Sequence, residues 1–195
     1  MNKPQRDMID VLVADHRELR QLFTQVERDK GQPAKRRRQL ADVVIAELVR
    51  HEAAEGRYLY PTARRVIPNG DTLADQELSE HAEAEKTMKQ LQRAKPSTPE
   101  FERLLDSLMQ RTREHLRQEE SEVFPKLREA CSKEELRELG RKVEVAKAAA
   151  PTRPHPHAPD KPPLNKLLGP GTGIVDKVRD LLTRRPTSRN DLKGK

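Results

Sequence analysis

Residues 51–61 read HEAAEGRYLYP, and residues 115–125 read HLRQEESEVFP. Both segments have a histidine, a glutamate four residues later, an aromatic residue nine later and a proline ten later. Because residues i and i+4 of a helix lie on the same face, each segment directs an imidazole and a carboxylate to one point. Two such pairs can share one metal site.

The 195-residue chain has only eight glycines and no tryptophan, and it is rich in Glu, Arg, Leu, Ala and Lys. This composition favours an all-α protein. The one cysteine, Cys131, cannot form an internal disulfide, and we expect it to be a buried small residue. The first twenty residues lack the apolar core of a signal peptide, and no later run approaches a membrane span. We therefore expect a cytoplasmic, soluble protein with no membrane contact.

The net charge of +7 is concentrated at the end of the chain. Residues 151–195 contain ten Lys and Arg against four Asp, which leaves a charge of only +1 for residues 1–150. We interpret the basic segment as a solvated tail, and nucleic acid as an unlikely partner, because no aromatic residue is interleaved with its cations.

Apolar residues at spacings of three and four predict five helices. The first four should form an up-down-up-down antiparallel four-helix bundle within residues 1–131, and the fifth an additional helix within residues 132–150. Pro61 and then Pro68-Asn69-Gly70 should break the second helix, and Ser132 with Glu135 forms a capping box before the fifth. The predicted ranges are 6–27, 34–61, 71–93, 99–130 and 133–149.

Residues 151–195 form a Pro/Gly-rich tail. Residues 151–159 should be extended, with His155 and His157 as spacer residues rather than ligands. Residues 169–173, which read GPGTG, should break regular structure. One short amphipathic piece follows, and its apolar side can dock on the bundle or stay free; it contains Ile174, Val178, Leu181 and Leu182.

One histidine falls on each of the first four predicted helices, at positions 16, 51, 81 and 115. Residues equidistant from a turn lie at the same height in an antiparallel hairpin. The midpoints of the first and the last pair fall in predicted turns, at 33.5 and 98. The bundle should therefore bring His16, His51, His81 and His115 to one level of its core.

Three carboxylates, Glu55, Glu85 and Glu119, each follow one of these histidines by four residues. A lone histidine on an apolar face is usually a hydrogen-bonded core residue, but four level histidines with three carboxylates need a counter-charge. Imidazole with carboxylate suits iron or manganese, with zinc possible. Seven protein ligands exceed the needs of one ion and fit two ions bridged by carboxylates and a solvent oxygen.

The ordered set of motifs resembles the hemerythrin-like domains of the HHE cation-binding group. The resemblance covers residues 6–130, and its motifs are Asp15-His16, His51-x3-Glu55 with Tyr60-Pro61, Glu80-His81-x3-Glu85, and His115-x3-Glu119 with Phe124-Pro125. It implies a non-haem di-iron centre with an oxo or hydroxo bridge. The four histidines would be terminal ligands, and Glu55 and Glu119 the bridging carboxylates.

The sequence departs from oxygen-carrying hemerythrins at two positions. They have a histidine where Glu85 stands, and an Asp five residues after the last histidine, where this chain has Glu120. We expect Glu119 to bind metal and Glu120 to point aside. An added carboxylate stabilises the ferric state, so the resemblance implies oxidation or sensing rather than reversible oxygen carriage.

Three functions follow as hypotheses. The first is a di-iron protein that reacts with a small oxidant (O2, hydrogen peroxide or nitric oxide), with catalase-like peroxide consumption as its enzymatic form. Tyr58 would then either hydrogen-bond a ligand or be a core aromatic. The second is a non-enzymatic sensor whose tail docks according to metal state. The third is nucleic-acid binding through Lys177, Arg179, Arg184, Arg185 and Arg189. The sequence predicts no oligomeric state.

Overall fold

The computed structural model describes residues 6–96, 98–155 and 164–192, and for residues 164–172 it describes the backbone alone. Within these ranges all regular structure is helical and no strand occurs, which confirms the predicted all-α class. None of the helices in this part of the chain combines the length and the apolar character needed to cross a bilayer.

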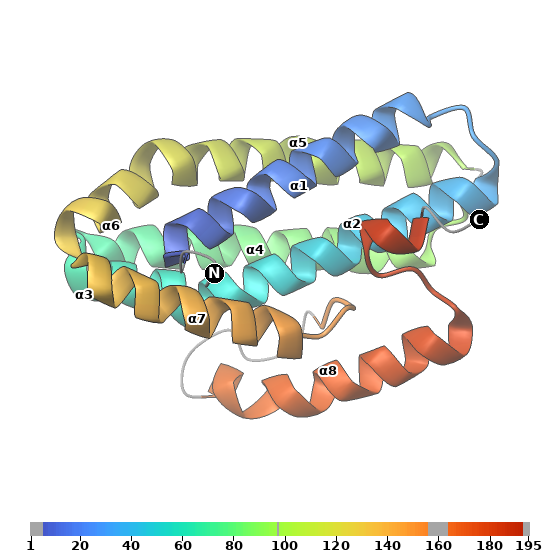
Figure 1. The fold of residues 1–195 in the computed structure, drawn as a ribbon. Coiled ribbons are helices and arrows are strands. Elements are labelled where there is room, and N and C mark those ends of the chain that lie inside the picture. Colours follow the sequence, from blue (N-terminus) through green and yellow to red (C-terminus); the bar gives the residue numbers. More distant parts are fainter. Residues whose placement is uncertain (1–5, 97, 156–163, 193–195) are drawn as a thin grey trace, which may run out of the picture.

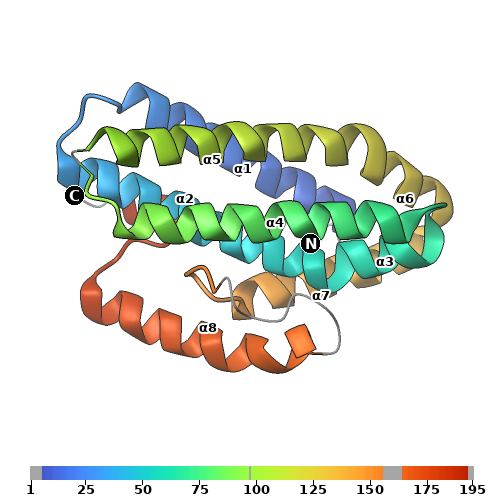
Figure 2. The same ribbon diagram turned by 180° about the vertical axis from the view of Figure 1, so that it is seen from behind.

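Four long helical rods lie side by side (Figures 1 and 2). The first and third are single helices, α1 (Met8–Arg28) and α4 (Gly70–Arg93). The second runs through α2 (Ala34–Ala54), a π-helical turn (Glu55–Leu59) and α3 (Tyr60–Val66). The fourth runs through α5 (Pro99–Gln118), a second π-helical turn (Glu119–Val123) and α6 (Phe124–Ala130). This arrangement is consistent with the predicted bundle.

We predicted that the second rod would end at Pro61, but it continues to Val66, and the π-helical turns explain why. In each turn one more residue is accommodated, so that the N–H of Tyr60 bonds to Glu55 O and the N–H of Phe124 bonds to Glu119 O. A new α-helix then begins, with proline in its first turn, where the missing N–H of proline leaves no intrahelical bond unmade. The prediction was wrong because it treated Pro61 as a helix terminator.

The interior of the bundle contains two apolar clusters. One gathers the turn-side halves of α1 and α2 with the facing ends of α4 and α5, including Phe23, Leu40, Met88 and Phe101. The other gathers the opposite ends, including Met8, Leu59 and Leu127. On each rod the histidine lies in the sequence between the residues of the two clusters or at the border of one of them, so a polar layer separates two apolar layers.

Helix α7 (Lys133–Ala149) lies against α1 and α2. Its first turn is capped by the Ser132 hydroxyl, which accepts a hydrogen bond from Glu135 N at 3.1 Å, as the predicted capping box requires. Fixing this helix across the bundle extends the second apolar cluster through Leu136, Val143 and Ala146.

The tail differs from the prediction. Residues 151–155 are non-helical as expected, and 156–159 lie outside the described residues. Helix α8 (Leu164–Thr183) then runs through Gly169 and Pro170, which we expected to break it, and a 3-10 turn (Arg189–Leu192) follows. Tertiary contacts can override intrinsic propensity, and α8 has such contacts at Gly173, Asp176 and Asp180, which are buried.

Candidate metal centre

Six of the seven predicted ligands converge in the polar layer of the bundle. His16 comes from α1, His51 from α2, His81 from α4 and His115 from α5, and each is at most 8% exposed. The two glutamates, Glu55 and Glu119, are fully buried first residues of the two π-helical turns.

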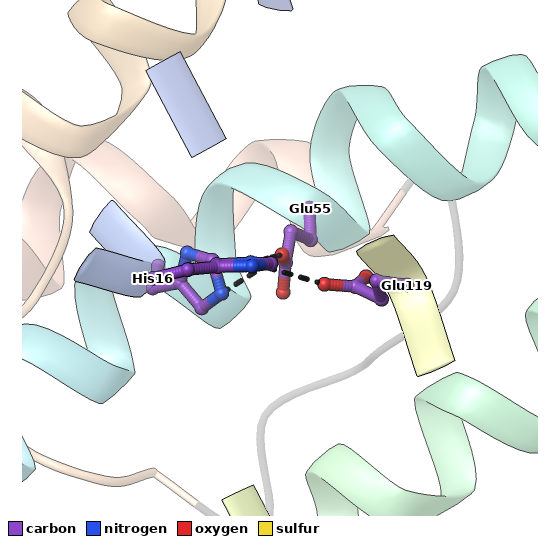
Figure 3. Close-up of side chains that lie close together, drawn as sticks. His16, Glu55 and Glu119 are labelled. Atoms are coloured by element: carbon purple, nitrogen blue, oxygen red, sulfur yellow. Dashed lines mark ion pairs between the residues drawn. The ribbon is translucent and has the colours of Figure 1, made fainter. Parts of the chain in front are cut away.

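Four of these side chains form a first group: His16, His51, Glu55 and Glu119. Glu55 Oε1 lies 2.9 Å from His51 Nε2 and 4.0 Å from His16 Nε2. Glu119 Oε2 lies 3.3 Å from His16 Nε2. Figure 3 shows His16, Glu55 and Glu119 directed toward one another. One atom from each of the four residues lies within 4.8 Å of all the others.

The second group contains Glu55, His81 and His115. The other oxygen of Glu55, Oε2, lies 3.5 Å from His81 Nε2 and 4.0 Å from His115 Nε2. Glu55 therefore presents one oxygen to each pair of histidines. A carboxylate in this position can bridge two ions.

Most polar atoms of the first group lack hydrogen-bond partners. Six buried atoms there have no hydrogen bond: His16 Nε2, His51 Nδ1, His51 Nε2, Glu55 Oε1, Glu55 Oε2 and Glu119 Oε2. Such atoms are costly unless something pairs with them. Ligand atoms about 2.1 Å from one ion lie roughly 3 Å apart at a right angle, and roughly 4.2 Å apart on opposite sides. The observed separations of 2.9 to 4.0 Å fit bound metal.

Glu85 belongs to neither group, although it follows His81 by four residues. Its side chain is half-buried on α4, which is a regular α-helix along its whole length. The two glutamates that do converge begin π-helical turns, and each is followed by an aromatic residue and a proline. Gln90 and Leu91 stand at the corresponding positions after His81. The absence of this aromatic-proline pair distinguishes Glu85 from Glu55 and Glu119. Its role as a metal ligand remains a prediction.

A carboxylate oxygen lies near the outer nitrogen of three of the histidines, and at His16 the contact is a hydrogen bond. His16 Nδ1 is 2.8 Å from Glu120 Oε1, and His115 Nδ1 is 2.8 Å from Glu77 Oε2. His51 Nδ1 is 3.6 Å from Asp15 Oδ2. A carboxylate at Nδ1 fixes the ring orientation and directs Nε2 inward, as in many metal sites. The predicted position of Glu120 agrees with this geometry, whereas we did not predict Asp15 and Glu77 as partners.

The aromatic residue that follows each glutamate contacts a histidine of the other helical hairpin. The Tyr60 hydroxyl donates a hydrogen bond to Glu119 Oε1 at 2.9 Å and lies 3.3 Å from His81 Nε2. Phe124 stacks on His16 with ring centroids 5.4 Å apart. Tyr58, for which we left two roles open, packs half-buried against the second apolar cluster. The π-helical turn accommodates an extra residue and so rotates Tyr60 toward the ligand groups. Tyr60 therefore has the hydrogen-bonding position that we considered for Tyr58.

Burial and neighbouring charges shift the pKa values of the clustered histidines and glutamates in different directions. Burial alone would lower the pKa of His51, but Glu55 and Asp15 raise it to about 10. Burial and the neighbouring His115 lower the pKa of His81 to about 3. Burial would raise the pKa of Glu55, yet His51 and the other imidazoles hold it well below its usual value. Burial and the charge of Glu55 raise the pKa of Glu119. Without metal, protons are therefore shared unevenly among these groups.

A cavity of about 350 Å³ opens beside the second group. Three of the four histidines, His51, His81 and His115, line it, and His16 does not. The remaining wall comes from α2, α4 and α5 and combines Leu48, Ala84 and Thr112 with charged side chains such as Arg111. Small molecules can therefore reach the second group from this face.

Comparison with known proteins agrees with the geometry. The model of the hemerythrin HHE cation-binding domain matches residues 7–127. An uncharacterised hemerythrin-like protein of Schizosaccharomyces pombe is 28% identical over 178 residues, which cover 91% of this chain and 87% of that protein. A protein of Nostoc sp. named DNA nickase is 30% identical over 148 residues, which cover 75% of this chain but 41% of the Nostoc protein.

The comparison with solved structures gave no match. The domain match spans more than half of the chain and includes all six converging side chains. The chain therefore belongs to the hemerythrin HHE cation-binding family.

Proposed function

We propose that the protein binds two iron ions and reacts with a small oxidant, O2, hydrogen peroxide or nitric oxide, at the second ligand group. The observation that carries the proposal is the sharing of Glu55 between two groups of unequal size. The first group offers four side chains and the second offers three. An ion held by three protein ligands keeps positions free for an exogenous molecule.

Access supports the assignment of the oxidant to the second group. Both histidines of the second group, His81 and His115, line the cavity, whereas in the first group only His51 does and both histidines are at most 2% exposed. The Tyr60 hydroxyl, 3.3 Å from His81 Nε2, lies beside the position that an oxidant would occupy. The single O–H of Tyr60, which donates to Glu119 Oε1 in this structure, can turn to a bound oxidant instead.

The set of ligand atoms determines the choice of metal. Imidazole nitrogen and carboxylate oxygen suit iron and manganese, and zinc is an alternative. Cys131 is not part of either group, so no thiolate competes. Iron supplies the one-electron steps that reduction of an oxidant needs, and the surrounding side chains bind, orient and hold protons. Turnover of peroxide would be the enzymatic form of this chemistry.

The test is anaerobic loading with ferrous iron, followed by exposure to each oxidant in turn. We expect two iron ions per chain and a near-ultraviolet charge-transfer band that appears with air and persists when air is removed. A band that vanishes again would indicate reversible oxygen binding instead. A chain that binds no iron, manganese or zinc would refute the proposal.

A second candidate, sensing of metal state by the tail, has one specific observation in its favour. Asp15, which faces His51 Nδ1, also pairs with Lys147 of α7. The adjacent Ala148 carbonyl accepts a hydrogen bond from Lys177 of α8. These contacts connect the metal centre to the tail. Limited proteolysis at residues 151–155 tests the idea, because cleavage rates independent of bound iron would remove its basis.

Nucleic-acid binding receives less support. The name of the Nostoc relative raises DNA as a substrate, but several tail cations that we considered are engaged within the chain. Lys177 donates to Ala148 O, Arg185 to Thr152 O and Arg189 to Gln21 Oε1. We expect neither nicking of supercoiled plasmid nor a salt-sensitive gel shift by the full chain.

A further inference from the structure

Helix α8 is turned with its polar side toward the protein. Among its described side chains, the buried positions are Gly173, Asp176 and Asp180, at helical spacings of three and four. A side chain in place of Gly173 would overlap the carbonyl oxygen of Ala149. The helix is thus seated against the end of α7 through a glycine and two carboxylates.

Both aspartates are firmly held. Asp176 Oδ2 accepts hydrogen bonds from Thr152 N at 3.2 Å and Arg153 N at 3.1 Å. Asp180 accepts bonds from the Thr152 hydroxyl and from Arg153 and Arg185, the latter at 3.3 Å. The two carboxylates are 3% and 4% exposed. These bonds fix the rotation of the helix about its axis.

The apolar side chains of α8 consequently face solvent. The sequence left open whether they dock on the bundle or stay free, and the structure leaves five of them more than half exposed: Ile174, Val175, Val178, Leu181 and Leu182. Within the described residues only one other large hydrophobic side chain is comparably exposed, Val145 on α7. Contiguous apolar surface of this kind marks an interaction site.

Charge on the outer face has one sign. At 100° per residue, Lys177 and Arg179 fall on opposite edges of the apolar stripe, and both are exposed. The Lys177 ammonium donates one of its three N–H groups to Ala148 O and keeps its charge at this edge. The acidic residues of α8, Asp176 and Asp180, are both on the buried side. An apolar stripe with a cation at each edge is the pattern of a helix that lies in the interface of an anionic bilayer.

We propose that α8 docks this face on an anionic lipid surface. A second copy of the chain is the less suitable occupant, because two such faces in contact would bring their flanking cations together. The sequence led us to expect no membrane contact because it contains no membrane span, and an interfacial helix needs none. The proposal is independent of the metal centre.

The first test uses the full chain with vesicles of phosphatidylcholine containing about a third phosphatidylglycerol. The chain has no tryptophan, so Leu182→Trp introduces a single fluorophore in the stripe, and Val145→Trp is the matched control on α7. We expect a blue shift on vesicle addition for Leu182→Trp and none for Val145→Trp. Equal responses, or no response from Leu182→Trp, would overturn the proposal.

The second test is vesicle co-sedimentation. Leu181→Glu should lower the partition coefficient about tenfold or more, because a buried leucine is replaced by a charge. Val145→Glu should have no effect, and Arg179→Gln should lower partitioning about fivefold. Binding that ignored Leu181→Glu would contradict the proposal. A concentration-dependent dimer in sedimentation velocity, dispersed by Leu181→Glu, would instead assign the face to a second copy.

Discussion

The two helical hairpins of the bundle have the same sequence skeleton but contribute differently to the metal centre. The first hairpin supplies His16, His51 and Glu55, whose two carboxylate oxygens face both histidine pairs without hydrogen-bond partners. The second supplies His81, His115 and Glu119. One oxygen of Glu119 accepts a hydrogen bond from Tyr60, and the other, Oε2, lies 3.3 Å from His16 Nε2 and 3.8 Å from His115 Nε2 without a hydrogen-bond partner. Glu119 therefore faces both histidine pairs with one oxygen, and Glu55 with two.

We attribute the difference to one hydroxyl. Tyr60 and Phe124 occupy corresponding positions, and each contacts a histidine of the opposite hairpin. Tyr60 can bond to Glu119, whereas Phe124 has no group to bond to Glu55. Two hairpins with the same sequence skeleton can thus form an asymmetric cluster, in which one ligand group is more enclosed and the other lies beside the cavity.

The largest effect should follow from Glu55→Gln. Among the residues that the structure describes, Glu55 alone belongs to both ligand groups, and the substitution removes its charge while keeping its shape. We expect iron content to fall from two ions per chain to near zero, because both groups lose their shared ligand. Metal analysis after anaerobic loading and gel filtration measures this result.

Glu85→Gln is the matched control for that experiment. It makes the same chemical change at a glutamate that also follows a histidine by four residues but lies outside both groups. If Glu85→Gln retains two iron ions per chain, Glu85 is not a metal ligand. Loss of an ion would instead restore the role that the sequence predicted for it.

The helical class and the convergence of six side chains were predictable from local pattern. Helical spacing places a histidine and a glutamate on one face, and the turn positions set the histidines at one height. Family membership followed from the same residues and is confirmed by the domain match to residues 7–127. In each case the information lies within one helix or one hairpin.

What could not be predicted depends on contacts between distant segments. A repeated aromatic and proline after Glu55 and Glu119 signals the π-helical turn, but we interpreted Pro61 as a terminator. Asp15 appears in the sequence only as part of the Asp15-His16 motif, and Glu77 carries no signal. Packing alone brings them to the outer nitrogens of His51 and His115. The hydropathy pattern likewise predicted that α8 is amphipathic, but it could not predict that the polar side faces the protein and the apolar side faces solvent.

Removal of a histidine from each hairpin should have unequal effects. His81→Ala leaves the second group with Glu55 and His115 only, whereas His16→Ala leaves three ligands in the first group. We expect one iron per chain for His81→Ala and close to two, bound more weakly, for His16→Ala. Equal stoichiometry in the two variants would show that the groups are equivalent and would contradict the asymmetry.

Metal binding should also release protons. With its pKa raised to about 10, His51 is protonated at neutral pH in the metal-free protein, and the pKa values of His16 and His115 are raised as well. A metal at Nε2 must displace such a proton, so affinity should rise with pH, about tenfold per unit for each proton, below that pKa. Zinc, which is redox-inactive, is the suitable probe, with a pH indicator in weakly buffered solution. Binding at pH 7.5 without proton release would show that these histidines are already neutral.

The smallest effect should come from Tyr60→Phe, which makes the two hairpins alike at this position. Loss of the bond to the buried Glu119 oxygen should lower the free energy of unfolding of the metal-free protein by about 1–3 kcal/mol. The freed oxygen would let Glu119 present one oxygen to each ligand group, as Glu55 does. The two iron affinities should then become more similar in a stepwise titration. Tyr58→Phe removes the same hydroxyl from a tyrosine two residues away that packs outside the metal centre, and it should change neither quantity. An unchanged ratio of affinities in Tyr60→Phe would mean that the hydroxyl is not the origin of the asymmetry, and that the cavity beside His81 and His115 sets it instead.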